Sequence, residues 1–578
     1  MTMITLKGLA ASPGIANGRV YLLETSQLAT PAREVANPEE ELRRFKRALH
    51  ATRTQLEVIR AKTEREVGAS EAAIFEAHLL ILEDPNFLKE VRLNVLEKGL
   101  NAETSVQQAV SKFSATLEAI PDPYFKARSA DIQDIGKRIV NNILGRSLDP
   151  LAKLESQVIV VARDLTPSDT AGMNRKMVLG FATDLGGLTS HTAILARSLN
   201  IPAVVGLGQV TTSVRNSEEI IVDGIKGVVV INPNPATSEQ FEREKQEHNA
   251  VRAKLNEVRF LAAETPDGRR VEVSANIGAI DEVEIALSNG AEGIGLLRSE
   301  FLYLDRDTLP SEEELLRAYG TIAEKMKPRP VIVRTLDVGG DKPPRYLKMP
   351  PETNPFLGLR GIRVSLGDEV GRELLKAQLR AVLRAGKRGR LKVMFPMISD
   401  VGEVREVQKV LNEVRSELAA QGLPYQQVEV GIMIETPSAA VTADILAKEV
   451  NFFSIGTNDL IQYSMAADRT NARVSYLYDP LHPSILRLIR NIIDSGHRNG
   501  ISVGMCGEMA GDPFCVQILL GLGLDEFSVG PFAIPRVKQI IRSTPSQEAI
   551  SLAEEALKLE TASETRLLAQ GGLEKLAE

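Results

Sequence analysis

The segment 186–199, GGLTSHTAILARSL, has a composition that could support covalent chemistry on a histidine. His191 follows two glycines and begins an amphipathic helix pattern, where free amide groups favour an anion. A neutral imidazole is also a nucleophile near physiological pH, so His191 is a candidate phosphohistidine. The ordinary alternative is that this histidine caps its helix or packs against it. Further donors to phosphoryl oxygens could come from Thr189, Ser190 and Thr192.

Four arginines stand close to the ends of apolar runs in the second half of the chain. Arginine binds phosphate and carboxylate oxygens in paired, planar geometry. Several arginines at one site would therefore select a substrate that carries both groups. Pairing with a surface carboxylate is the better interpretation of a lone arginine, but placement at strand ends favours the anion site. The four are Arg298, Arg334, Arg360 and Arg469.

Two carboxylates, Glu435 in GIMIETPSA and Asp459 in SIGTNDL, follow two successive apolar runs. If these runs are neighbouring strands, the carboxylates could meet, and with water and substrate oxygens they would make a suitable Mg²⁺ site. Pairing with nearby arginines is the alternative, and it is compatible with metal binding. Asn458 could add a hydrogen bond to a phosphate.

The two cysteines are interpreted separately, because they cannot form a zinc tetrad and their spacing fits no common redox motif. Cys506 lies between Gly504 and Gly507, which predicts close approach of a ligand. Its thiol could act as an acid toward carbon, although the residues alone favour a small buried hydrophobe. Cys515 lies in a helix pattern and is expected in the core.

Eight short apolar runs alternate with helix-patterned segments in the second half of the chain. This rhythm predicts a parallel (β/α)8 barrel. In that fold the chemistry lies where strands end, and most of the polar candidates fall there, together with Glu508. The runs are VEVSANIG, AEGIGLLRSE, PVIVRTLDVGG, LKVMFPMIS, EVGIMIETPSA, NFFSIGTNDL, ISVGMCGEMA and DEFSVGP.

The first half of the chain has a different texture. Short apolar runs with glycines occupy residues 1–23, a helix-like stretch follows to about residue 146, and strand-like runs return from residue 156. This pattern predicts one α/β domain that is interrupted by a bundle of four or five helices. A proline-marked break at residues 232–235 precedes a long charged helix that could link the two halves.

Length and charge limit the class of protein. The chain has 578 residues, more than a single core accommodates, so two to four domains are expected. A net charge of −7 argues against general nucleic-acid binding. No apolar run could cross a bilayer and no basic-apolar leader stands at the N-terminus, so we expect no membrane insertion and a cytoplasmic location.

The chain resembles the Enzyme I family of the bacterial phosphotransferase system, the phosphoenolpyruvate-protein phosphotransferases, in six motifs along essentially its whole length. These are GGLTSHTAILARSLNIPAVVG, RTLDVGGDK, NPFLGLRGIR, GIMIETPSA, SIGTNDLIQY and GMCGEMAGD. The motifs around His191 and in the barrel are also similar to those of pyruvate phosphate dikinase and phosphoenolpyruvate synthase. This chain has no motif for the large nucleotide-binding domain of those enzymes.

The resemblance implies a role for each candidate residue. His191, supported by Thr189 and Ser190, attacks the phosphorus of phosphoenolpyruvate, and enolpyruvate leaves. Cys506 then protonates the enolate at C3 to give pyruvate, with Glu508 in position to assist. The implied metal ligands are Glu435 and Asp459, which hold Mg²⁺. The implied substrate ligands are Arg298, Arg334, Asn458, Asp459 and Arg469, with Arg360 nearby.

The resemblance also implies partners and domains. Phosphohistidine passes its group to a histidine of the small carrier HPr, which docks on the helical insertion, and the family forms homodimers through the barrel. In-line transfer needs the reacting atoms about 3 to 3.5 Å apart, so the linker helix is the expected hinge region. The implied domains are a phosphohistidine α/β domain (1–23 and 146–231), an inserted helical HPr-binding domain (24–145), a linker helix (232–264) and a phosphoenolpyruvate-binding barrel (265–578).

Two other functions remain open on the sequence alone. A metal-dependent barrel lyase or aldolase that acts on pyruvate-like enolates would use the same barrel, but it leaves GGLTSHT unexplained. A non-catalytic regulator that binds partners through the helical region would have no need of Arg298, Glu435, Asp459 and Cys506. Labelled phosphoenolpyruvate separates the three, because the leading hypothesis expects acid-labile label on His191.

Overall fold

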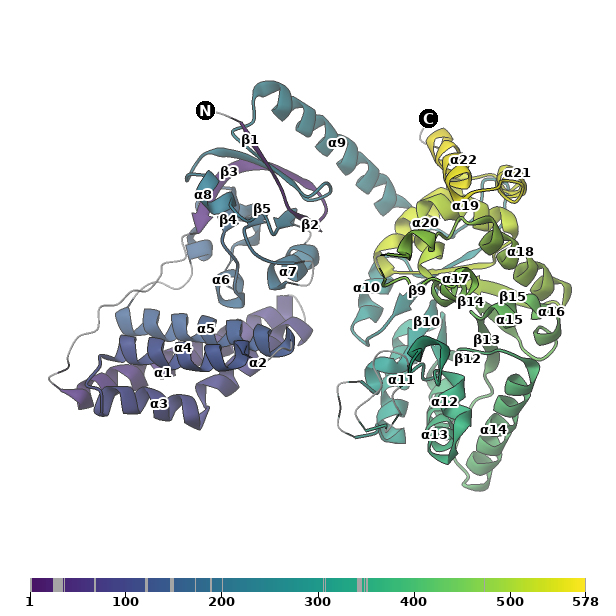
Figure 1. Ribbon diagram of the computed structural model, residues 1–578, viewed down its shortest axis with the longest axis horizontal. Helices are drawn as coiled ribbons and strands as arrows, with labels where there is room; N and C mark the ends of the chain where they lie inside the picture. The colour runs from purple at the N-terminus through teal and green to yellow at the C-terminus, as the bar shows by residue number, and fades with distance from the viewer. Residues whose placement is uncertain are drawn as a thin grey trace. The chain divides into compact units, whose positions relative to one another are not determined.

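The chain divides into two compact units, residues 1–251 and 252–578 (Figure 1). Each unit has hydrophobic clusters of its own. Within the described part of the chain, no helix is long and apolar enough to cross a membrane. The computed structural model describes residues 3–23, 35, 37–66, 69–119, 123–145, 150–171, 173–187, 190–199, 201–304, 306, 308–339, 346–347, 349, 352–471 and 473–576.

An eight-stranded mixed sheet forms the centre of the first unit. Its order is β1-β8-β7-β3-β4-β5-β6-β2, in which β3 to β6 run parallel and the outer pairs are antiparallel. Alternate residues of β4 enter two different apolar clusters, so the sheet is covered on both faces. The strands are β1 (Ile4–Lys7), β2 (Leu9–Ser12), β3 (Ile15–Leu23), β4 (Val158–Ala162), β5 (Val178–Thr183), β6 (Ala203–Val205), β7 (Glu219–Asp223) and β8 (Val228–Ile231).

Five helices lie between β3 and β4 in the sequence, although these two strands are neighbours in the sheet. Their apolar faces share one cluster, in which Leu56 and Ile139 are fully buried. Asp84 caps the helix that begins at Pro85, because its carboxylate accepts the backbone amide of Asn86 at 2.8 Å. The helices are α1 (Pro38–Glu66), α2 (Ala69–Leu82), α3 (Pro85–Leu96), α4 (Ala102–Glu118) and α5 (Pro123–Leu144). Three short helices, α6 (Pro167–Ala171), α7 (His191–Leu199) and α8 (Val210–Ser213), accompany the sheet.

The boundary between the two units falls within the long helix α9 (Pro235–Val258). The chain directly after this helix is fixed to the barrel by Lys538, whose side chain is buried on α20 (Ile534–Ser543). A buried ammonium needs hydrogen-bond acceptors, and here three backbone carbonyls supply them. The acceptors are the carbonyl oxygens of Arg259 (3.1 Å), Leu261 (2.9 Å) and Gly290 (2.8 Å).

The second unit is a closed barrel of eight parallel strands in the order β9 to β16, as the sequence predicts. The strands are β9 (Glu272–Ile277), β10 (Ile294–Arg298), β11 (Pro330–Arg334), β12 (Arg390–Phe395), β13 (Glu429–Ile434), β14 (Phe452–Ile455), β15 (Ser502–Met505) and β16 (Glu526–Val529). The further helices are α10 (Glu282–Ser288), α11 (Glu312–Met326), α12 (Ile362–Gly367), α13 (Glu369–Ala385), α14 (Val401–Ala420), α15 (Pro437–Val441), α16 (Ala443–Leu446), α17 (Thr457–Met465), α18 (Pro483–Arg498), α19 (Pro513–Leu522), α21 (Ser546–Ala556) and α22 (Ala562–Lys575).

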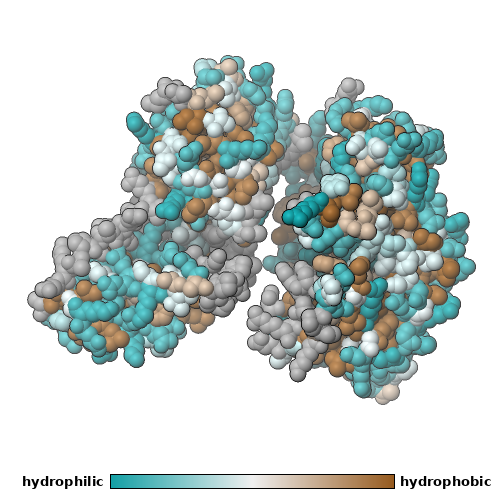
Figure 2. Space-filling view, in the orientation of Figure 1, coloured by the Kyte–Doolittle hydropathy of each residue, from teal (hydrophilic) through white to brown (hydrophobic). Residues whose placement is uncertain are grey.

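Side chains of the barrel strands alternate between the surrounding helices and the barrel interior. The outward side chains join the large core of this unit, whereas the inward ones form a separate cluster that reaches Cys506. The other members of the inner cluster are Leu296, Ile332, Met394, Met433 and Phe452. On the face seen in Figure 2, hydrophilic residues alternate with small hydrophobic patches in both units.

Candidate active site

A cavity of about 700 Å³ opens at the carboxyl end of the barrel strands. Strand ends meet there because all eight strands run in the same direction, which is why residues far apart in the sequence share one cavity. Nine of the residues expected from the sequence line it. They are Arg298, Arg334, Arg360, Glu435, Asn458, Asp459, Arg469, Cys506 and Glu508.

Arg334 is held between two carboxylates at the end of β11. Its Nη2 donates to Glu300 at 3.0 Å, and its Nη1 lies 3.1 Å from Asp337. Burial alone would lower the pKa of Arg334, but the charges of Glu300 and Asp337 outweigh burial and raise the pKa above its usual value. Arg334 is therefore a fixed cation in the wall of the cavity.

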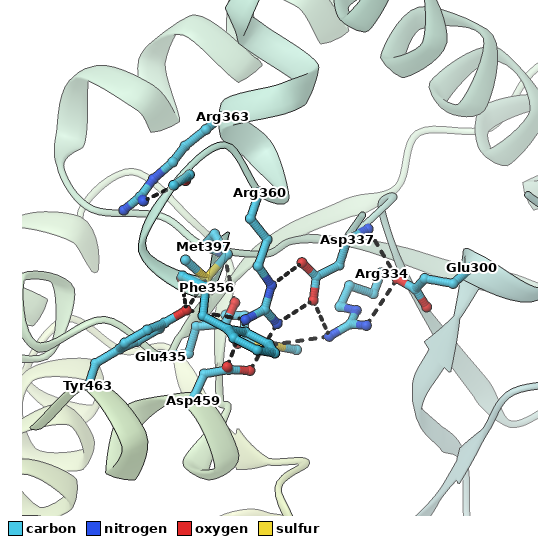
Figure 3. Close-up of polar contacts among 12 residues, drawn as sticks. Glu300, Arg334, Asp337, Phe356, Arg360, Arg363, Met397, Glu435, Asp459 and Tyr463 are labelled. Atoms are coloured by element: carbon cyan, nitrogen blue, oxygen red, sulfur yellow. Dashed lines mark hydrogen bonds and ion pairs between the residues drawn. The ribbon is translucent and has the colours of Figure 1, made fainter. Parts of the chain in front are cut away.

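Arg360 joins two carboxylates that come from different strand ends (Figure 3). Its Nε and Nη2 each lie 3.1 Å from an oxygen of Asp337, while Nη1 and Nη2 lie 2.8 and 3.1 Å from Asp459. Tyr463 accepts a hydrogen bond from Arg360 and donates one to the carbonyl of Phe356 at 2.6 Å. Asp459 is thus paired with an arginine, which is the alternative to metal binding that the sequence left open for this carboxylate.

Glu435 is the most deeply buried carboxylate that lines the cavity. One of its oxygens accepts the backbone amide of Met397 at 2.6 Å. Burial, followed by the charges of Asp459 and Asp337, raises the pKa of Glu435 to about 8. Carboxylate charge is therefore in excess beside Glu435, as a site that receives a cation requires.

The described residues contain no group of three or more histidine, cysteine, aspartate or glutamate side chains arranged to hold a metal ion. A metal at this cavity would depend on Glu435 and Asp459, with water and substrate oxygens for the remaining positions. Such a donor set of hard oxygens suits Mg²⁺, which commonly takes one or two carboxylates from the protein.

Cys506 follows β15 and is buried. Burial raises the pKa of its thiol to about 12, against the opposing effects of a hydrogen bond with Ser454 and the charge of Arg334. The group is therefore a thiol and carries a proton at neutral pH. A buried thiol at the wall of a polar cavity meets the first requirement of a general acid.

The glycines on either side of Cys506 leave room for other parts of the barrel. A Cβ on Gly507 would overlap the hydroxyl of Thr457, and a Cβ on Gly504 would lie 2.9 Å from a carboxylate oxygen of Glu526. The Cβ position of each glycine is therefore taken by another part of the barrel. Gly507 also lines the cavity, so the close approach of a ligand expected there stays a prediction.

Four polar residues lie at the more exposed side of the cavity. Asn458 and Glu508 bond reciprocally, with Glu508 N donating to Asn458 Oδ1 at 3.0 Å and Asn458 Nδ2 to Glu508 Oε1 at 3.4 Å. Arg298 and Arg469 are exposed at this side of the cavity, in contrast to the enclosed Arg334. The exposed guanidinium groups are thus accessible to an anion from solvent.

The other candidate segment lies in the first unit, where α7 begins at His191. Gly186 adopts a φ of +108°, and the hydroxyl of Ser190 accepts the amide of Ala193 at 3.4 Å. Thr192 is buried and donates to the carbonyl of Leu165, so it is not placed as a donor to a ligand. Thr189 and the side chain of His191 lie outside the described residues.

Comparison with known proteins matches three family models to this chain: "PEP-utilising enzyme, N-terminal" over residues 7–128, "PEP-utilising enzyme, mobile domain" over 154–227 and "PEP-utilising enzyme, PEP-binding domain" over 252–546. The phosphoenolpyruvate-protein phosphotransferase of Bacillus sp. (strain S) is 49% identical over 97% of this chain and 96% of that protein. The corresponding figures are 48%, 97% and 96% for the protein of Geobacillus stearothermophilus.

This chain belongs to the phosphoenolpyruvate-protein phosphotransferase family. The family resemblance drawn from its motifs is thereby confirmed. A solved member, the NMR solution structure of Enzyme I (nEIt), is 44% identical, with a TM-score of 0.37, and covers 42% of this chain and 99% of that chain.

Several contacts in this chain could not be foreseen from its sequence. Asp337 stands at a strand end, but its position between Arg334 and Arg360 has no signal in the sequence. Met397 has a φ of +58°, a conformation that is usually adopted by glycine or asparagine and that a methionine in the sequence does not predict. In the helical segment, His78 is buried, and its Nε2 lies 3.4 Å from Asp131.

Proposed function

We propose that this chain transfers the phosphoryl group of phosphoenolpyruvate first to His191 and then to a histidine of the carrier protein HPr, and releases pyruvate. The observation that carries the proposal is the cavity at the barrel mouth, where guanidinium groups, carboxylates and a protonated thiol meet. The names of the nearly full-length relatives support the same reaction.

Substrate binding is assigned to the arginines of this cavity. Phosphoenolpyruvate carries a phosphate and a carboxylate, and guanidinium groups bind both through paired hydrogen bonds. Arg298 and Arg469 are exposed enough to receive the entering anion, while Arg334 and Arg360 are already fixed by carboxylates. Asn458 adds a hydrogen bond to the phosphate, and Asp459 orients Arg360 toward the substrate.

Glu435 and Asp459 would hold Mg²⁺, the cofactor implied by the family resemblance. When bound, Mg²⁺ supplies positive charge that orients substrate oxygens and offsets charge that develops during transfer. The excess of carboxylate charge around Glu435 supports this assignment. Asp459 keeps its ion pair with Arg360 in the proposal, because a carboxylate has lone pairs for more than one partner.

The transfer itself uses two residues. The imidazole of His191 attacks phosphorus, a P–N bond forms, and the bond from phosphorus to the bridging oxygen breaks. The electron pair stays on the enolate of pyruvate, which takes a proton at C3 from the Cys506 thiol. Thr189 and Ser190 support the phosphoryl group at His191, and Glu508 assists near Cys506.

The partner proposals extend beyond the barrel. HPr docks on the helical insertion, residues 24–145, and the chain works in the cytoplasm.

We further propose a homodimer through the barrel. The exposed apolar side chains of Leu357, at the end of a short 3-10 helix, and Val441 on α15 favour such a contact. A cavity of about 830 Å³ is lined by Leu357 and the start of α15. Sedimentation of the wild type and Val441→Asp tests it, and a monomeric wild type would refute the dimer.

The reaction is tested by incubation of the full chain with labelled phosphoenolpyruvate and Mg²⁺. Acid-labile label should appear on the wild type and on His248→Ala, which removes a histidine of α9, and it should be absent from His191→Ala. HPr added afterwards should take up the label. Label on His191→Ala at the level of the control would contradict the central assignment.

A further inference from the structure

Two glutamates lie inside the barrel on the amino-terminal side of the cavity. Glu272 begins β9 and Glu526 begins β16, and the two residues are direct neighbours in the strand register. Barrel interiors are usually filled by branched apolar side chains. Two adjacent carboxylates in this position therefore call for a physical explanation.

Glycines on the neighbouring strands make room for these carboxylates. A Cβ on Gly293 would lie 2.6 Å from Glu272 Oε1, and one on Gly295 would overlap Glu526 Oε1. On the other side, a Cβ on Gly504 would lie 2.9 Å from Glu526 Oε2. Since glycine weakens a strand interior, three glycines around two carboxylates indicate a chamber that the sequence maintains for them.

The chamber lies next to the Cys506 thiol. Ser454 is in register with Gly504, and Gly504 is in register with Glu526, so these residues form one row across β14, β15 and β16. The Ser454 hydroxyl acts on the Cys506 thiol as a neighbouring hydrogen-bond donor, and the thiol itself donates to the carbonyl of Ile455 at 3.8 Å. Gly504 has no side chain to separate the Ser454 hydroxyl from Glu526. Thiol, hydroxyl and carboxyl thus follow one another from the cavity toward the amino end of the barrel.

Several other charged groups face the pair of glutamates. Burial, followed by the charge of Glu272, raises the pKa of Glu526 to about 7, and burial also raises the pKa of Glu272. One proton is therefore shared by the pair near neutral pH. Lys392, which is 2.7 Å from Glu429, acts in the opposite direction. The remaining facing groups are Glu292, Arg390 and Asp525, the last of which pairs with His497 at 2.8 Å.

We propose that Glu526, paired with Glu272, is the proton reservoir that restores the Cys506 thiol after each turnover. This proposal rests on the proposed function. When Cys506 has given its proton to C3, pyruvate still occupies the cavity side of the sulfur. The neutral carboxyl of Glu526 gives a proton to the hydroxyl of Ser454, which passes its own proton to the thiolate. Water at the amino end of the barrel then protonates the carboxylate pair, and no other reactant is consumed.

The test compares the first turnover with the later ones in the full chain. In Glu526→Gln, pyruvate formed in the first turnover, measured by rapid quench with labelled phosphoenolpyruvate, should match the wild type, because Cys506 starts with its proton. Steady-state pyruvate formation with HPr as acceptor should fall by about tenfold or more. Glu284→Gln, which removes an exposed carboxylate of α10, is the matched control and should leave both phases unchanged.

The pH profile separates proton delivery from a structural role. Wild-type steady-state turnover should fall as pH rises through about 7, where Glu526 loses its proton. Glu272→Gln removes the neighbouring charge and should move this fall to lower pH, while Glu526→Gln should have no such fall. If Glu526→Gln has the steady-state rate and the pH profile of the wild type, the proposal that Glu526 is a proton reservoir is overturned. If that variant does not fold, an unmoved fall in Glu272→Gln overturns it.

The two proposals fail in different ways. If the wild type takes no label from phosphoenolpyruvate in its first turnover, the proposed function is wrong. If it takes label normally but the glutamate variants behave as the wild type in every later turnover, only the reservoir is wrong.

Discussion

The barrel mouth and the His191 segment are built in opposite ways. In the barrel, charged side chains hold one another, and Arg360 alone contacts oxygens of Asp337 and Asp459. Among the described residues just before α7, Gly186 has a positive φ and the hydroxyl of Ser190 makes one weak contact with the next turn. One site is an interlocked network, and the other is a short helix start with few described side-chain contacts.

This difference indicates that the barrel mouth and the His191 segment meet different requirements. A receptor for a small, doubly charged anion gains affinity and orientation when its groups are fixed in advance. In the proposed function, His191 serves two partners in turn, and a nucleophile of this kind gains nothing from such a network at its side. We therefore expect substitutions in the barrel mouth to spread their effects to neighbouring residues, whereas those in the His191 segment should remain local.

The largest effect is expected from Arg360→Met. This change leaves Asp337 and Asp459 without their shared cation in a buried position, which typically costs about 3 to 5 kcal/mol of folding free energy. Phosphorylation by phosphoenolpyruvate should fall about a thousandfold, because the positioning of Asp459 is lost as well. Thermal unfolding and labelling measure the two effects, and a variant that unfolds as the wild type does would break the picture of an interlocked site.

The next effect is expected from Cys506→Ala, which removes the thiol proton but no charge pair. Pyruvate formation should slow by about a hundredfold, the usual contribution of a positioned general acid. Substrate binding, followed by calorimetry, should stay close to wild type. Near-normal pyruvate formation would refute the role of Cys506 as acid, and Cys506→Ser serves as the control for the size of the side chain.

Most of the barrel and many of the residues of its cavity could be predicted from the sequence, because strands are indicated by short local patterns of apolar residues. Runs such as GIMIE and FFSIG announce strands by their apolar residues, and parallel order brings the strand-end residues Arg334, Glu435 and Asp459 to one cavity. Contacts between loops could not be predicted in the same way. The pairing of Arg360 with Asp337 joins side chains whose separation depends on the whole barrel.

The two glycines near Cys506 are a further example of a contact that the sequence does not predict. From the sequence, Gly504 and Gly507 make space beside Cys506, but the sequence does not reveal what fills that space. Thr457 and Glu526 fill it, and each comes from a different strand or helix. A pattern can reveal that a position must be small, whereas only packing reveals which neighbour requires it.

A pair of glycine substitutions tests the contrast between the two regions at the level of the backbone. Gly507→Ala puts a methyl group against the hydroxyl and amide of Thr457 and should lower the free energy of unfolding by about 2 kcal/mol. Gly187→Ala is the matched change near His191, where a Cβ meets nothing within 4 Å, and should stay within about 0.5 kcal/mol of wild type. Equal melting temperatures of the two variants would contradict the contrast.

The smallest effect is expected from Ser190→Ala, which removes the hydroxyl before α7. Loss of a helix-capping hydroxyl costs about 0.5 to 1 kcal/mol, and the long contact of 3.4 Å to Ala193 favours the lower value. Chemical denaturation of the full chain measures it. A loss as large as that of Arg360→Met would show that the His191 segment is more tightly held than its described contacts indicate.

Lys538 sets a practical limit on how the molecule can be divided. A shortened chain that begins at residue 265, the expected start of the barrel, would retain all eight strands. It would nevertheless lack the carbonyls of Arg259 and Leu261, and the ammonium of Lys538 would stay buried with two of its three acceptors missing. The shortest well-behaved barrel fragment should therefore start before Arg259, and the last turn of α9 belongs to the barrel in any dissection of this protein.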